Sequence, residues 1–268
     1  MSSSPILKDK NAIVFGAGGS IGAAVAKEFA AEGAEVFLAG RTKSKVEEVA
    51  KEITADGGRA HAAVIDAMDD VAVNEYIDDI AKRSGSIDIV FNAVGVPAKE
   101  YGNGKSAVDL AIEEFMLPVT TVLKSQFITA RAAARHMVQQ HSGVIIFLTG
   151  GPARSHVQGT SAIGAAFGAI EALTRNLALD VSPAGVRVVC IRSAAMPDTR
   201  TIQETVDAMV GMMNISKDQA IAALANLTLL KVSPRASDTA KAAAFLASDR
   251  ARIMTGTVLN SSAGAVAD

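Results

Sequence analysis

Short apolar runs alternate with longer amphipathic segments along most of the chain. This alternation predicts strand–helix–strand units and a parallel sheet that helices cover on both faces. The apolar runs predict strands at about 11–15, 35–39, 59–65, 87–93, 143–149, 186–192 and 256–260. The segments between them predict helices at about 20–33, 43–56, 69–84, 105–140 with a break near Pro118, 161–182 and 236–248. We therefore expect one doubly wound α/β domain over residues 1–268, with a seven-stranded, mostly parallel sheet.

Residues 196–230 interrupt this alternation with a methionine-rich amphipathic insertion that begins MPDTRTIQETVDAMVGMM. The insertion follows the sixth predicted strand, and α/β sheets bind their ligands at the carboxyl ends of their strands. One interpretation is therefore a lid over a substrate. The other is a packing excursion or a subunit contact.

Composition and charge exclude several classes of partner. The chain of 268 residues is 49% hydrophobic and has a formal net charge of −2 without a block of like charges, so it has no basic surface for nucleic acid or an anionic membrane. No secretory signal and no membrane-spanning apolar run is visible, so we expect a cytoplasmic protein with a small-molecule substrate. The single Cys190 excludes an internal disulfide, and His61, His136 and His141 have no metal-binding spacing.

The first predicted strand leads into a glycine-rich turn that opens the first helix. Glycines let the backbone turn tightly and approach a pyrophosphate, and the N–H groups of a helix N-terminus favour its negative charge. In this strand–turn–helix context we predict a dinucleotide site of the Rossmann type, against the alternative of a purely structural turn. The residues of the turn are Gly16, Gly18, Gly19, Ser20, Ile21 and Gly22.

The end of the second strand indicates which dinucleotide is preferred. NAD-binding proteins usually carry an acidic residue there for the ribose hydroxyls, and this chain has Gly40 followed by Arg41. A guanidinium binds a 2′-phosphate with charge-assisted hydrogen bonds, so NADP(H) is predicted over NAD(H). The alternative is that Arg41 is a solvated charge at the start of a helix.

The turn does not match G-x-G-x-x-G, because Ile21 stands at the last glycine position. It resembles the T-G-x-x-x-G-x-G turn of the short-chain dehydrogenase/reductase family, with Phe15 for the threonine and Ser20 for the middle glycine. A serine can cap the helix by accepting an N–H bond. The C-terminal LASDRARIMTGTVLNSSAG also resembles the family's last helix and strand. The resemblance implies further cofactor-binding residues, an acid beside the adenine and an N-A-x-G turn along the cofactor: Asp66, Asn92, Ala93 and Gly95.

The same resemblance implies where catalysis would occur. In the family, a serine at the end of the fifth strand and a Y-x-x-x-K pair on the next helix act on the substrate and the nicotinamide ribose, and an asparagine on the preceding helix completes a proton relay. GVIIFLTG and GAIEALTRNLALDV align without a gap to the flanking family segments, which places Gly150, Ile163 and Phe167 at the serine, tyrosine and lysine. Val122 falls at the asparagine. None of these side chains carries a titratable group.

Four other residues are candidates for protonating or binding a substrate: His156, Ser155, Thr149 and Tyr101. Histidine has the ordinary pKa nearest neutrality, although a loop histidine without a carboxylate partner is commonly a solvated surface residue. The two hydroxyls donate hydrogen bonds but are poor general acids. Tyr101 follows the fourth strand and can reach the same cleft.

Two glycines one turn apart on the sixth helix, Gly164 and Gly168, have two interpretations. Glycine is tolerated in a helix where another backbone approaches closely, and it also leaves space for a bulky ligand. The family commonly assembles through the two long helices that flank the fifth strand. We therefore expect a homodimer or homotetramer.

Three functions remain open from the sequence. The first is an atypical NADP(H)-dependent oxidoreductase of the short-chain dehydrogenase/reductase type, which acts on an activated C=C or carbonyl group of a small organic substrate without the Tyr/Lys pair. The second is a non-catalytic protein that binds dinucleotide as a sensor or partner subunit. The third is a non-redox enzyme on the same fold.

Overall fold

The sheet of this computed structural model, which describes residues 4–155 and 157–267, confirms the predicted fold class. Seven strands lie within the described residues in the order β3-β2-β1-β4-β5-β6-β7. Each neighbouring pair is parallel. The strands are β1 (Asn11–Phe15), β2 (Glu35–Gly40), β3 (Arg59–Val64), β4 (Ile89–Asn92), β5 (Gly143–Gly150), β6 (Val186–Ser193) and β7 (Thr257–Asn260).

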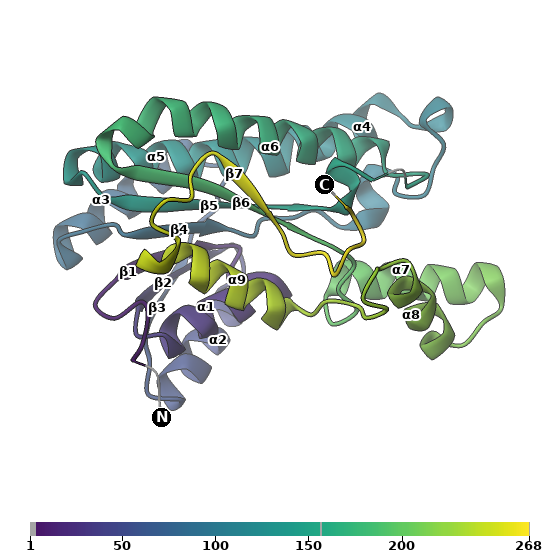
Figure 1. Ribbon diagram of the computed structural model, residues 1–268, viewed down its shortest axis with the longest axis horizontal. Helices are drawn as coiled ribbons and strands as arrows, with labels where there is room; N and C mark the ends of the chain where they lie inside the picture. Colours follow the sequence, from purple (N-terminus) through teal and green to yellow (C-terminus); the bar gives the residue numbers. More distant parts are fainter. Residues whose placement is uncertain (1–3, 156, 268) are drawn as a thin grey trace.

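Helices cover both faces of the sheet, and each face has its own hydrophobic core (Figure 1). The first face is covered by α1 (Ser20–Ala31), α2 (Lys43–Ala55) and α9 (Ala236–Ala247). The second is covered by α3 (Asp70–Ser84), α5 (Lys124–Gln140) and α6 (Ser161–Val181). Because the central strands are buried from both sides, they read as continuous apolar runs in the sequence, as β1 does with all five residues buried.

The predicted helix at 105–140 is wrong at its start and in its break. Residues 107–109 form only a short 3₁₀ turn, and the helix begins with α4 (Ile112–Pro118). Pro118 does not interrupt it, because a π-helical turn, η3 (Val119–Leu123), follows and leads directly into α5. Proline lacks the N–H that an α-helix needs, and a change to π-type bonding lets the chain continue in the same direction.

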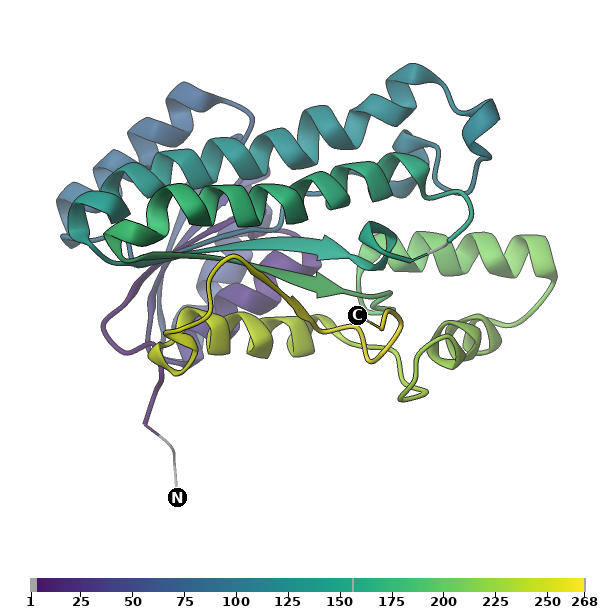
Figure 2. The same ribbon diagram turned by 45° about the horizontal axis from the view of Figure 1, so that its top comes forward.

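The insertion after β6 is a pair of helices, α7 (Arg200–Met213) and α8 (Lys217–Asn226), that projects beyond one end of the sheet (Figures 1 and 2). Ser216 caps α8 by accepting a hydrogen bond from the Gln219 N–H at 3.2 Å. Only Val206 and Ala220 are buried within the two helices. The helix pair therefore buries few side chains, as expected of an element that moves.

Candidate functional site

The glycine-rich turn lies at the carboxyl end of β1, where the order of the strands changes direction between β1 and β4. Connections leave the sheet toward opposite faces at this point, so a crevice opens beyond the strand ends. The Ala93 N–H donates to the Phe15 carbonyl at 2.9 Å and holds the ends of the two strands together. The predicted cofactor turn and the N-A-x-G turn therefore lie at one edge of the sheet.

Two positions of the turn require glycine. Gly16 has a φ of +72°, and a Cβ there would lie 2.8 Å from the carbonyl carbon of Ala93. A Cβ on Gly22 would lie 2.3 Å from the Gly16 carbonyl oxygen. Helix α1 thus begins in direct contact with the turn, and only glycine permits that approach.

The N-terminus of α1 is suited to an anion. Gly19 is the N-cap, and the first helical bond runs from the Ala23 N–H to the Gly19 carbonyl at 2.8 Å. The N–H groups before Ala23 have no acceptor within the helix, and together with the helix dipole they can hold a phosphate. The capping role suggested for Ser20 is wrong, because Ser20 is the first helical residue and no side chain caps the helix.

Asn92 shapes the turn after β4. Its side-chain amide donates to the Thr129 hydroxyl at 3.0 Å and accepts from the Val94 N–H at 2.8 Å. Nothing lies within 4 Å of the place that a Cβ on Gly95 would occupy. The two hydrogen bonds of Asn92 therefore fix the conformation of the turn, and the space beside Gly95 is open.

Arg41 is exposed at the end of β2, on the same edge of the sheet. An acidic side chain has no room at the preceding residue, because a Cβ on Gly40 would lie 2.8 Å from Val46 Cγ1. Asp66 is exposed at the end of β3, and its carboxylate accepts from the Met68 N–H at 3.0 Å. The guanidinium is thus an exposed positive charge directly after β2, at the end of the sheet where the first βα turn lies.

Gly150, Ile163 and Phe167 form one apolar contact region. Ile163 is buried in a cluster with Ala98, Tyr101 and Ala162, and Phe167 packs against that cluster. A Cβ on Gly150 would lie 3.1 Å from Phe167 Cε2. The region at which the resemblance places a hydroxyl, an acid and a cation therefore contains tightly packed hydrocarbon. Val122, at the asparagine position, lies in η3 and is buried in the core of the second face.

Thr149 belongs to a buried polar network instead of an open cleft. Its hydroxyl lies 3.3 Å from Glu171 Oε1 and 3.5 Å from Cys190 Sγ. Glu171 forms a bidentate ion pair with Arg192, with Nε–Oε1 at 2.7 Å and Nη2–Oε2 at 2.8 Å. Burial raises the pKa of the Cys190 thiol to about 12. This network ties α6 to the ends of β5 and β6.

The Glu171–Arg192 pair was not predicted from the sequence. The local signal is that each charged residue follows an apolar stretch, FGAI before Glu171 and VVCI before Arg192. A charge in a buried segment needs a partner, but the sequence does not say which one.

The remaining candidates occupy the loops around this region. Ser155 follows the short turn η4 (Gly151–Ala153), and its buried hydroxyl has no hydrogen-bond partner among the described residues. Tyr101 ends the turn η1 (Ala98–Tyr101), and it is buried beside Ile163. His156 lies outside the described residues. The structure therefore brings Tyr101, but not Thr149, to the predicted catalytic region.

The two helix glycines differ in their surroundings. A Cβ on Gly164 would lie 2.8 Å from the Pro152 carbonyl oxygen, which shows that this glycine permits close packing of α6 on η4. Nothing lies within 4 Å of a Cβ on Gly168. Close packing therefore explains the first glycine only.

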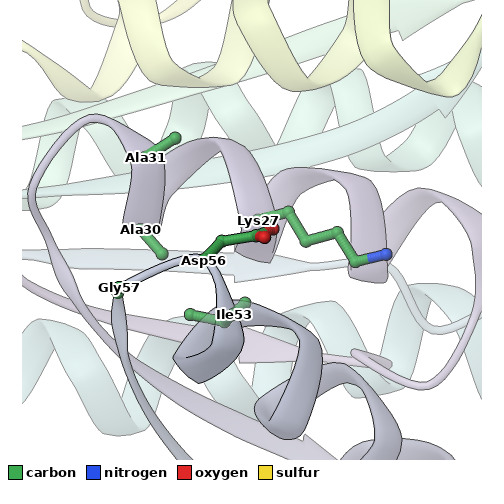
Figure 3. A pocket seen from close by; sticks show the side chains of 7 residues that line it. Lys27, Ala30, Ala31, Ile53, Asp56 and Gly57 are labelled. Atoms are coloured by element: carbon green, nitrogen blue, oxygen red, sulfur yellow. The ribbon is translucent and has the colours of Figure 1, made fainter.

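A cavity of about 210 Å³ lies away from the cofactor turn, between the C-terminal ends of α1 and α2 (Figure 3). Lys27 and Ala30 line it from α1, and Ile53 lines it from α2. These helix ends lead into the starts of β2 and β3, so the cavity is at the opposite edge of the sheet. Across residues 4–155 and 157–267, no helix is long and apolar enough to cross a membrane, and no group of three metal-binding side chains is found.

Comparisons with known proteins identify relatives of the whole chain. A family model described as Enoyl-(Acyl carrier protein) reductase matches residues 16–265. An uncharacterized oxidoreductase of Mycobacterium tuberculosis is 31% identical over 258 residues, which are 96% of this chain and 92% of the relative. An uncharacterized oxidoreductase of Bacillus subtilis is 28% identical over 97% of this chain and 92% of the relative.

Solved structures agree with this relationship. A crystal structure of NAD⁺-bound xylitol dehydrogenase has a TM-score of 0.86 and 26% identity, over 95% of this chain and 98% of that chain. A protein described as a short chain dehydrogenase/reductase family protein has a TM-score of 0.79 and 28% identity, over 97% of this chain and 98% of that chain. The sheet order, the glycine turn and these matches together place the chain in the short-chain dehydrogenase/reductase family of oxidoreductases.

Proposed function

We propose that this protein is an NADP(H)-dependent oxidoreductase that acts on an activated C=C or carbonyl group of a small organic molecule without a tyrosine–lysine pair. The observation that carries this proposal is the contrast between the two halves of the site. The Gly16–Gly22 turn keeps the backbone geometry that suits a pyrophosphate. Ile163 and Phe167 form an apolar surface where the family resemblance places an acid and a cation.

The residues of the chain suit a dinucleotide. The N-terminus of α1 would hold the pyrophosphate, Arg41 the 2′-phosphate, and the turn from Asn92 to Gly95 would lie beneath the nicotinamide half. When bound, the nicotinamide supplies a hydride. The xylitol dehydrogenase structure contains NAD⁺, but the lack of room for an acidic side chain at Gly40 and the charge of Arg41 favour the phosphorylated cofactor in this chain.

The cofactor preference is tested by fluorescence titration of NADPH and NADH. Hydrogen bonds to charged groups contribute about 1.5–3 kcal/mol, so Arg41→Ala should weaken NADPH binding by roughly 10- to 100-fold and leave NADH nearly unchanged. Arg250→Ala removes an exposed charge beyond the end of α9 and serves as the matched control. An equal loss for both cofactors would contradict the assignment of Arg41.

The apolar surface limits the substrates that such an enzyme can reduce. Positioning beside a hydride donor lowers a barrier without acid catalysis, which suffices for a polarised double bond but less well for a simple ketone. The proton would come from solvent. We expect NADPH oxidation with enones or quinones to exceed that with simple ketones, and the combined Gly150→Ser, Ile163→Tyr and Phe167→Lys protein to gain ketone reduction. No gain in a folded, NADPH-binding variant would contradict the alignment.

The packed cluster around Ile163 also favours a second function, a non-catalytic protein that binds the dinucleotide as a sensor or partner subunit. This function predicts NADPH binding without NADPH oxidation across the same panel of enones, quinones and ketones. Sustained turnover with any of them would exclude it.

Two further proposals concern assembly and motion. An open groove of about 500 Å³ lies between η3–α5 and α6, with apolar lining from Phe127, Ala169 and Leu173. We place a homodimer or homotetramer contact there, and Phe127→Glu should shift the mass measured by light scattering toward the monomer. Val71→Glu, at an exposed position of α3, is the control and should leave the mass unchanged. The α7–α8 pair would act as a lid over the substrate.

A further inference from the structure

The lid helix α7 packs against the turn η1, and this contact joins the insertion to the apolar cluster around Ile163. Tyr101 lies at the contact and is 6% exposed. Tyr101 belongs to the buried cluster that includes Ile163, and Leu110 and Phe115 pack against that cluster. The phenol therefore comes to the predicted substrate region from η1, whereas Ile163 comes to it from α6.

Glu204 lies on the lid side of the same contact. Its Oε1 accepts a hydrogen bond from Arg200 Nε at 2.9 Å. Its Oε2 is buried and has no hydrogen-bond partner among the described residues. A buried carboxylate oxygen is an acceptor only, so the chain leaves one strong acceptor without a donor.

The Tyr101 hydroxyl and the Glu204 carboxylate are electrostatically coupled. Burial, with a further contribution from the negative charge of Glu204, raises the pKa of Tyr101 to about 12. The phenol therefore stays protonated at neutral pH and presents an O–H group. The pair offers one donor and one acceptor at the edge of a hydrocarbon surface.

We propose that Tyr101 and Glu204 form a specificity site that holds a hydroxyl or ammonium group of the substrate, at the end away from the atom that is reduced. A donor from the substrate would satisfy Glu204 Oε2, and the apolar residues around Tyr101 would pack against its carbon skeleton. The proposal rests on the proposed reductase function and adds the substrate class, a small carbonyl or enone compound that carries an O–H or N–H donor. Both residues are positioning residues for this group.

The test compares three probes that differ at one position: cyclohexanone, 4-hydroxycyclohexanone and 4-aminocyclohexanone. Binding to the NADPH-saturated protein is measured by saturation-transfer NMR, which requires no turnover. A hydrogen bond to a charged group corresponds to roughly 10-fold or more in affinity, so the hydroxyl or the amino probe should bind at least that much more tightly than cyclohexanone.

Variants separate the two donors from each other and from a general effect of the lid. Glu204→Met should remove the preference for either donor, and Tyr101→Phe should reduce it. Glu204→Gln keeps an acceptor but loses the charge, so it should weaken the amino probe more than the hydroxyl probe. Asp207→Asn, an exposed change on the same helix beside Lys217, should leave all three affinities unchanged.

Equal affinity for the three probes, including no binding of any, would overturn the specificity site, as would a preference that survives Glu204→Met. Selective binding without NADPH oxidation by the probes or the enone and quinone panel supports the specificity site and refutes the reductase. NADPH oxidation with no preference for a donor supports the reductase and refutes the specificity site. The two proposals therefore fail in distinguishable ways.

Discussion

The packing of Phe167 against Gly150 is tested by adding a side chain at position 150. A Cβ there would lie 3.1 Å from Phe167 Cε2, inside the ordinary carbon–carbon contact distance of about 3.5–4.0 Å. Overpacking costs about 1–3 kcal/mol. Because Phe167 is only half-buried, its ring can shift in part. We therefore expect Gly150→Ser to lower the free energy of unfolding by about 1–2 kcal/mol.

The contact is isolated by repeating the change in a Phe167→Ala background. Without the ring, the next neighbour of a Cβ on Gly150 is Pro152 Cδ at 3.7 Å, which is an ordinary contact distance. Gly150→Ser should then cost less than about 0.5 kcal/mol, so the coupling energy should be about 1 kcal/mol. Urea unfolding followed by far-ultraviolet circular dichroism measures all four free energies, provided that the transitions are two-state.

An equal cost of Gly150→Ser in both backgrounds would refute the contact, and with it the idea that the two positions are packed as a unit. Gly95→Ser is the control, because nothing lies within 4 Å of a Cβ there and the backbone is outside the left-handed region. It should change stability little with or without Phe167.

Other parts of the structure give further predictions. Gly164→Ala should destabilise the fold by about 1–3 kcal/mol, whereas Gly168→Ala should stabilise it by up to about 1 kcal/mol, and thermal unfolding of the pair measures the difference. Arg192→Met should cost about 3–5 kcal/mol because it leaves Glu171 buried and unpaired, and adding Glu171→Leu should recover most of that loss in urea unfolding. The raised pKa of Cys190, about 12, keeps its thiol protonated in the fold while the unfolded thiol ionises near pH 8.5, so alkaline pH should favour unfolding. A thiol reagent at pH 8 should therefore react with Cys190 only after urea is added, and rapid labelling of the native protein would contradict its burial.

The sheet was predictable because its strands differ from the helices in local pattern. Residues 12–15 and 144–148 are apolar without interruption, as is typical of a central parallel strand. The start of the helix before β5 was not predictable in the same way. Residues 105–111 have a composition compatible with a helix, and only their tertiary surroundings decide that α4 begins at Ile112.

In the candidate site, too, the local features were predictable from the sequence and the long-range contacts were not. The turn from Gly16 to Gly22 is local, so its geometry follows from its own glycines and the strand and helix beside it. Glu171 and Arg192 are 21 residues apart, and Tyr101 meets Ile163 across an even longer separation. Long-range contacts of this kind depend on the packed fold, and no spacing in the sequence encodes them.

Contacts among the three family positions change what their residue types imply. Read one at a time, Gly150, Ile163 and Phe167 are three separate losses of chemistry. In the fold, the Phe167 ring lies where a side chain on Gly150 would extend, and it also packs against the cluster that contains Ile163. A serine restored alone would meet the ring, and a tyrosine restored alone would find hydrocarbon where a cation should lower its pKa. Polar chemistry at the reacting atom must therefore be restored at all three positions together, or the proton must come from solvent.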